Sequence, residues 1–76
     1  MTTFKVRLPM GKNIQSFVAV TQNYPYEIDL IQGRHNVNGQ SLLGIFSLDL
    51  SKDITVVIYS DDCEDLMTDL SPFIAW

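Results

Sequence analysis

The apolar and polar residues at the start of the chain alternate, which predicts a β-strand. From Thr3 to Leu8 every second residue is apolar, and this is the period of a strand with one buried face. Pro9 ends the pattern because proline has no N–H group to donate to a neighbouring strand. The alternation returns over residues 26–31 and predicts a second strand there.

Two further strands are predicted in the second half of the chain. Residues 32–35, Gln-Gly-Arg-His, have the composition of a hairpin turn and lead into a short strand around residues 36–38. Residues 54–59 are apolar at nearly every position. A run of this kind is typical of a central strand.

The first helix is predicted over residues 14–23. Asn13 is a suitable N-cap, and the Tyr24-Pro25 pair stops the helix because proline cannot continue it. The spacing of the apolar residues gives the helix one inward face, made of Ile14, Phe17, Val18 and Thr21.

The last helix is predicted to begin at the polar residues 60–62. Ser60 can cap it, and the carboxylates that follow suit the positive end of the helix dipole. Leu66 and Leu70 lie on its inward stripe. Pro72 ends the regular helix near Leu70 or Ser71, because proline inside a helix costs about 3 kcal/mol.

Residues 41–50 form the most apolar segment, and we predict a helix capped by Ser41. Its apolar side chains fall into two rows at helical spacing: Leu42, Ile45 and Leu48 in one, and Leu43, Phe46 and Leu50 in the other. A sheet can cover only one row. The other row is either buried against a second helix or exposed as a surface on which a partner docks.

The predicted order of elements is βαββαβα, an α+β fold with a largely antiparallel four-stranded sheet. We expect a single domain over residues 1–76, since 76 residues leave no room for a second core. The predicted core comprises Phe4, Val6, Phe17, Ile28, Leu30, Ile45, Leu48, Val56, Ile58 and Leu66.

The charge balance argues against a nucleic-acid partner. The net charge is −4, with only five Lys and Arg residues, whereas nucleic-acid-binding proteins need a basic face. We therefore expect other proteins as partners. No signal sequence and no run of about 20 apolar residues is visible, so the cytoplasm is the expected location and no membrane association is expected.

The residues usually found in catalytic or metal sites are few. Cys63 and His35 are the only cysteine and histidine, so a disulfide, a zinc site and a Ser-His-Asp triad are not expected. Asp61, Asp62, Glu64 and Asp65 lack the spacing of a calcium loop. Carboxylates around Cys63 disfavour a reactive thiolate. We expect no metal, no cofactor and no enzymatic activity.

The segment from Ser41 to Leu48 resembles the second helix of HPr, the histidine phosphocarrier of the bacterial sugar phosphotransferase system. Members of that family read Ser-(Ile/Leu)-(Met/Leu)-Gly-(aliphatic)-(Met/Phe)-(Ser/Thr)-Leu there, after a Val-Asn pair that matches Val37 and Asn38. The resemblance extends from Phe4 to about Leu70. It implies an open-faced βαββαβα sandwich with three helices on one face of the sheet.

The resemblance also implies where the chemistry of the family would lie. The family carries a phosphorylatable histidine at the start of the first helix, in a Gly-(Leu/Ile)-His-Ala-Arg-Pro loop. This chain has a shorter loop there, with Met10, Gly11 and Lys12 and no histidine. We expect His35 to lie at the far end of its strand pair from the first helix, and so predict no phosphohistidine.

Two further sites follow from the resemblance. Ser41 matches a serine that a dedicated kinase, HPr kinase, phosphorylates in many Gram-positive members, so Ser41 is a candidate for regulatory phosphorylation. Leu42, Leu43 and Phe46 match the surface on which the phosphotransferase, the kinase and a transcriptional partner dock.

Three functions are compatible with the sequence. The chain is a protein-binding or regulatory member of the phosphotransferase system that cannot be phosphorylated on histidine, a working phosphocarrier, or an unrelated small α+β interaction domain. The loop without a histidine favours the first.

Overall fold

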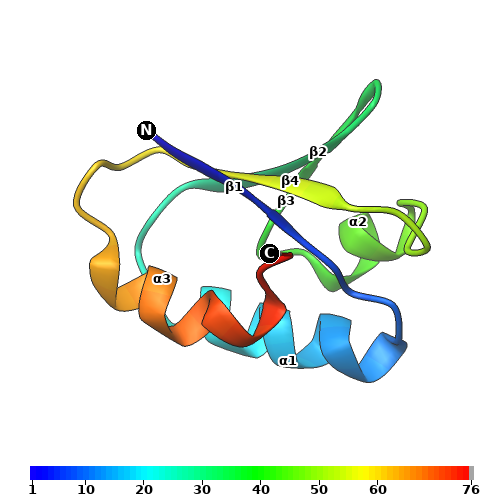
Figure 1. Ribbon diagram of the computed structural model, residues 1–76, viewed down its shortest axis with the longest axis horizontal. Helices are drawn as coiled ribbons and strands as arrows, with labels where there is room; N and C mark the ends of the chain where they lie inside the picture. Colours follow the sequence, from blue (N-terminus) through cyan, green and yellow to red (C-terminus); the bar gives the residue numbers. More distant parts are fainter. Residues whose placement is uncertain (76) are drawn as a thin grey trace.

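The computed structural model describes residues 1–75 and shows a four-stranded antiparallel sheet with helices on one face (Figure 1). Trp76 lies outside the described residues. In chain order the elements are β1 (Thr2–Val6), α1 (Gly11–Thr21), β2 (Ile28–Gln32), β3 (His35–Asn38), α2 (Leu42–Phe46), β4 (Ile54–Ile58), α3 (Glu64–Leu70) and a 3₁₀ turn (Ser71–Phe73). The predicted βαββαβα order is confirmed.

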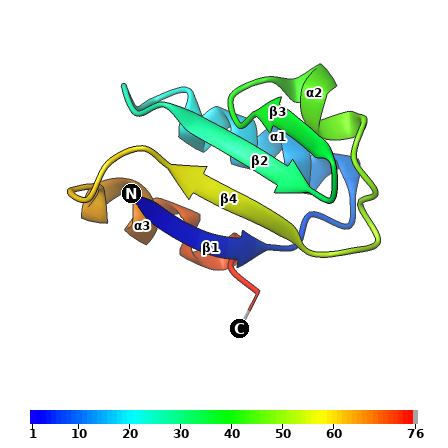
Figure 2. The same ribbon diagram turned by 90° about the horizontal axis from the view of Figure 1, so that it is seen from above.

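The strands are arranged in the order β1-β4-β2-β3, so the apolar segment predicted as a central strand does lie inside the sheet (Figure 2). Phe4 pairs with Val56 across β1 and β4, and Leu30 pairs with Val56 across β2 and β4. A short bridge between Val6 and Ile74 places the end of the chain beside β1.

The core lies between the sheet and the helices, as the apolar pattern predicted. Nine of the ten predicted core residues are buried, and Phe4 is half-buried against the same cluster. The ring of Phe17, which is completely buried, meets Phe73 edge-on with 5.6 Å between the ring centroids. This contact joins α1 to the segment that follows α3.

Helix α1 begins three residues before the predicted start, so the assignment of Asn13 as its N-cap is wrong. Met10 is the N-cap residue and makes no side-chain cap. Its carbonyl accepts hydrogen bonds from the N–H groups of Asn13 at 2.9 Å and Ile14 at 3.3 Å. The helix therefore begins with main-chain hydrogen bonds alone. Methionine is not a favoured N-cap residue, so the sequence gives no signal for a helix start at Met10. The helix ends at Thr21, short of the predicted Asn23.

Helix α2 is shorter than predicted because the side chain of Gln32, at the end of β2, holds the segment that follows the helix. The Gln32 amide donates to the Asp49 carbonyl at 2.8 Å, and its oxygen accepts from the Asp49 N–H at 2.7 Å. These two bonds draw the chain toward the end of β2, so the helix stops at Phe46. Leu50 therefore lies beyond the helix and packs against the core instead of continuing an exposed row.

The predicted start of the last helix at Ser60 is also wrong. Residues 60–62 form a loop in which the Asp62 N–H donates to the Ser60 hydroxyl at 3.1 Å, and Cys63 is the N-cap residue of α3. Cys63 is buried and makes no side-chain cap, so the sequence carries no capping signal for this start. The regular helix ends at Leu70, as predicted from Pro72.

The turn before α2 is fastened to the end of α1. The hydroxyl of the buried Thr21 donates to the Gly39 carbonyl at 3.0 Å, and the Gln40 side chain donates to the Thr21 carbonyl at 2.8 Å. Gln40 also bonds the Tyr24 carbonyl at 3.1 Å. The Thr21 carbonyl also accepts from the Tyr24 N–H at 3.2 Å. The bonds from Gln40 therefore hold the turn before α2 against the end of α1.

Two tyrosines tie the segment between α1 and β2 to α3. Tyr24 follows the helix, as predicted, whereas Tyr26, which was predicted to lie in a strand, is in the same connecting loop. Their rings stack with centroids 6.0 Å apart. The Tyr24 hydroxyl donates to the Asp69 carboxylate, and the Tyr26 hydroxyl donates to Asp65 at 2.9 Å.

The Tyr24 bond predicts a loss of stability at high pH. Hydrogen bonding to Asp69 raises the pKa of Tyr24 to about 12, from an ordinary value near 10. A raised folded-state pKa means that this contribution is complete below about pH 10 and is lost as the pH rises toward 12. We expect Tyr24→Phe to be less stable than the native chain at neutral pH, with the difference shrinking between pH 10 and 12. Urea unfolding of both proteins across this range measures it, and a constant difference would contradict it.

Candidate functional site

Ser41 occupies the N-cap position of α2, as its place in the sequence predicted. Its backbone is extended, with φ −107° and ψ 112°, and its hydroxyl accepts from the Gly44 N–H at 3.2 Å. Helix α2 packs closely here, because a Cβ added at Gly44 would lie 3.3 Å from both the Ser41 hydroxyl and the Val37 side chain. Ser41 therefore lies on a rigid turn and is half-buried.

The outer row of α2 is exposed. Ile45 is fully buried and Leu48 is 6% exposed, whereas Leu43 is 83% exposed and Phe46 is 45% exposed. Leu42 lies at the border and is half-buried. Of the two alternatives that the sequence left open, burial of Leu43 and Phe46 is therefore wrong. We refer to Leu42, Leu43 and Phe46 as the α2 surface.

The α2 surface adjoins the start of α1. The Phe46 ring lies over Gly11, and a Cβ added there would be 3.6 Å from the ring, at ordinary contact distance. Met10, the preceding residue, is 54% exposed. Met10 was predicted to lie in the loop and not on the apolar surface. The sequence does contain a signal for this part of the surface, namely an apolar residue, Met10, in the turn directly after Pro9.

Met10 at the end of the loop after β1, and Gly11 and Lys12 in the first turn of α1, supply no nitrogen nucleophile that can accept a phosphoryl group. Met10 ends in a thioether, Gly11 has no side chain, and Lys12 presents an exposed ammonium group. A lysine ammonium donates hydrogen bonds and has no free lone pair. This loop can contribute a positive charge and apolar contacts to a neighbouring molecule.

His35 lies at the same end of the sheet as the start of α1, which corrects the predicted placement at the far end. His35 pairs with Gln32, Ile31 pairs with Thr55, and the adjacent Ile54 pairs with Val6, the last residue of β1. The hairpin returns to this end because β2 follows α1 and runs in the opposite direction to it. His35 is nevertheless on the opposite edge strand of the sheet from β1.

The other candidate groups are engaged in structural contacts. The Cys63 thiol is buried and lies 3.4 Å from the Thr2 hydroxyl. Of the four nearby carboxylates, Glu64 and Asp65 are in the first turn of α3, and Asp65 accepts from the Leu66 N–H at 2.9 Å. Within residues 1–75, no three His, Cys, Asp or Glu side chains are grouped as metal ligands.

No helix among residues 1–75 has the length and apolar character needed to cross a membrane.

Comparison with known proteins identifies one family to which the chain is similar over nearly its whole length. A family model described as "PTS HPr component phosphorylation site" matches residues 3–75. No curated protein matches the chain. The structure of HPr-C-His from Thermoanaerobacter tengcongensis is similar, with a TM-score of 0.78, 20% identity, and coverage of 95% of this chain and 89% of that one. The phosphocarrier protein HPr from Bacillus anthracis str. Ames has a TM-score of 0.72, 19% identity, and coverage of 97% and 96%.

Proposed function

Because the chain belongs to the HPr family of the sugar phosphotransferase system, we propose that it is a member that binds partner proteins through the α2 surface and is not phosphorylated on histidine. Family membership excludes the alternative of an unrelated domain with a convergent fold. The partners in this proposal are components of the phosphotransferase system, and HPr kinase is a further candidate.

One observation carries the proposal: an exposed apolar surface lies directly beside a loop that has no histidine. Leu43 is 83% exposed and Phe46 reaches Gly11, so the two halves of the site form one continuous face. Large exposed apolar side chains that cluster on a small domain are typical of a protein-binding site. The face is therefore suited to binding a partner, while the loop has no group for phosphoryl transfer.

We assign a regulatory role to Ser41 as part of the same proposal. A phosphate on Ser41 would place negative charge at the N-terminus of α2, where the helix dipole favours it. The same charge would stand next to Leu42 at the border of the α2 surface. Phosphorylation would thus alter docking more than folding. The side chain of Gln40, the preceding residue, is bound to the Thr21 and Tyr24 carbonyls, so the turn that carries Ser41 is joined to the end of α1.

Phosphoryl transfer provides the test. We expect no mass gain when the protein is incubated with phosphoenolpyruvate and the general phosphotransferase of the system, then measured as an intact protein. The Bacillus anthracis phosphocarrier serves as the positive control for the reagents. Addition of one phosphate that maps to His35 and disappears in His35→Gln would overturn the proposal.

The placement of His35 supports a second candidate, a working phosphocarrier. His35 lies at the end of the sheet where α1 begins. A phosphotransferase docked on the α2 surface would therefore be at the same end of the molecule as His35. The imidazole of an exposed histidine can form a phosphoramidate. The mass measurement with native protein and His35→Gln separates the two candidates.

A further inference from the structure

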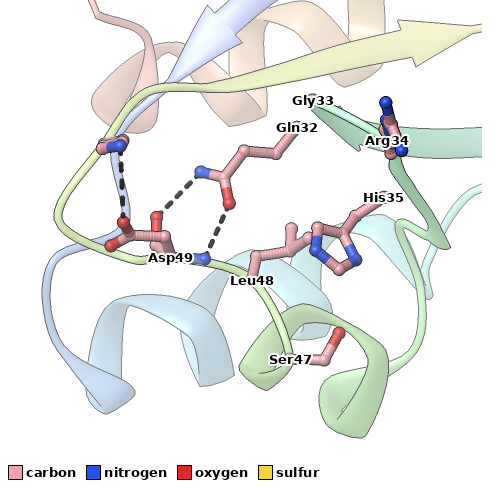
Figure 3. A pocket seen from close by; sticks show the side chains of 8 residues that line it. Gln32, Gly33, Arg34, His35, Ser47, Leu48 and Asp49 are labelled. Carbon is pink, nitrogen blue, oxygen red and sulfur yellow. Dashed lines mark hydrogen bonds and ion pairs between the residues drawn. The ribbon is translucent and has the colours of Figure 1, made fainter.

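An open hollow lies between the β2–β3 hairpin and the segment that follows α2 (Figure 3). Its volume is about 650 Å³, which falls within the range of pockets that bind small molecules. It is lined by Gln32, Gly33, Arg34, His35, Ser47, Leu48, Asp49 and Lys52. Figure 3 shows the His35 ring directed toward Leu48, with Arg34 on the hairpin side and Asp49 on the opposite side.

Two of the cationic side chains of this acidic protein line the hollow. The chain has five Lys and Arg residues and a net charge of −4, yet Arg34 and Lys52 both line one opening, with Asp49 as its acidic side chain. Within residues 1–75, Arg34 has no carboxylate within ion-pair distance. Arg7, by contrast, is bound to Asp53 at 2.7 Å. Arg34 is therefore available to a ligand.

The wall on the Asp49 side is held in place. Gln32 binds the main chain of Asp49 through both its amide nitrogen and its oxygen. The Asp49 carboxylate accepts from the Ser51 hydroxyl at 2.6 Å and from the Ser51 N–H at 3.1 Å. Lys52 lies 3.9 Å from that carboxylate. A wall fixed by hydrogen bonds does not have to be ordered when a ligand binds.

From this arrangement we infer that the hollow binds a small organic phosphate monoester. The planar guanidinium of Arg34 suits phosphate oxygens, the imidazole of His35 can donate a further hydrogen bond, and the Lys52 ammonium adds charge. The volume exceeds what a phosphate group fills, so the organic part of the ligand has room beside Leu48. The site is distinct from the α2 surface and does not depend on the proposed docking function.

Titration with glycerol phosphate tests the inference, with amide chemical shifts as the readout and ionic strength held constant with sodium chloride. We expect saturable shifts confined to residues 32–35 and 47–52, no response to glycerol, and weaker binding of inorganic phosphate. Shifts spread over the whole chain, or no saturation, would overturn the inference. Equal affinity for inorganic phosphate would overturn the assignment of an organic ligand.

Three variants sharpen the test. Arg34→Gln should weaken binding about tenfold, since it removes charge-assisted hydrogen bonds. Asp49→Asn should strengthen binding, because it removes the negative charge of the hollow. Lys5→Gln is the matched control: it changes the net charge as Arg34→Gln does, on an exposed β1 residue that does not line the hollow. Equal weakening by Lys5→Gln and Arg34→Gln at unchanged melting temperatures would show only a general charge effect and refute the site.

Discussion

Replacing both Leu43 and Phe46 with serine should remove most of the affinity for phosphotransferase components while leaving the fold intact. Burial of these two side chains at an interface contributes about 3–5 kcal/mol before the costs of association. Neither side chain is in the core of the free protein, where Leu43 is 83% exposed and Phe46 is 45% exposed. The folding free energy should therefore change by less than about 1 kcal/mol.

Calorimetric titration of the double variant with the general phosphotransferase measures the loss of affinity, and urea unfolding measures the stability. Tyr59→Ser is a suitable control. Tyr59 is an aromatic residue just beyond the end of β4, and its exposure of 46% is almost the same as that of Phe46. Binding that survives in the double variant would refute docking on the α2 surface. A loss of several kcal/mol in stability would instead assign the two side chains to the core.

Adding a single methyl group at Gly39 should destabilise the protein strongly. A Cβ at this position would lie 2.5 Å from the Ile28 Cγ2 atom and 3.3 Å from the Ile28 carbonyl oxygen. Ile28 is 2% exposed and cannot move aside freely. Overpacking of this kind costs about 1–3 kcal/mol, and we expect about 3 kcal/mol for Gly39→Ala. A domain of this size has a total stability of about 4–11 kcal/mol.

Gly11→Ala is the matched control for Gly39→Ala. The added methyl group at Gly11 would meet the Phe46 ring at 3.6 Å, an ordinary contact distance, and α1 gains helix propensity from alanine. We expect its free energy of unfolding, measured with urea, to equal or exceed that of the native chain. Similar losses of stability in both variants would show that the close approach of Gly39 to Ile28 in β2 does not cause the destabilisation.

The kinds of elements and most of the core could be predicted from the sequence. The alternation that predicted β1 and β2, and the helical spacing of Ile14 and Val18 on the inner face of α1, are local properties. A residue's neighbours two or four positions away share its face whatever the rest of the chain does. The resemblance of residues 41–48 to HPr led to the family in the same way, through a short contiguous match.

The ends of elements and the neighbours of the candidate site could not be predicted this way. The start of α2 at the Ser41 cap was predicted, but its end was not, because the segment after the helix is held by Gln32 from the end of β2. His35 is brought to the end of the sheet where α1 begins because β2 runs back along the first helix. The apolar pattern predicted most of the residues that are buried together. The tertiary structure decided the boundaries and the site, because both rest on hydrogen bonds and contacts between residues far apart in the chain.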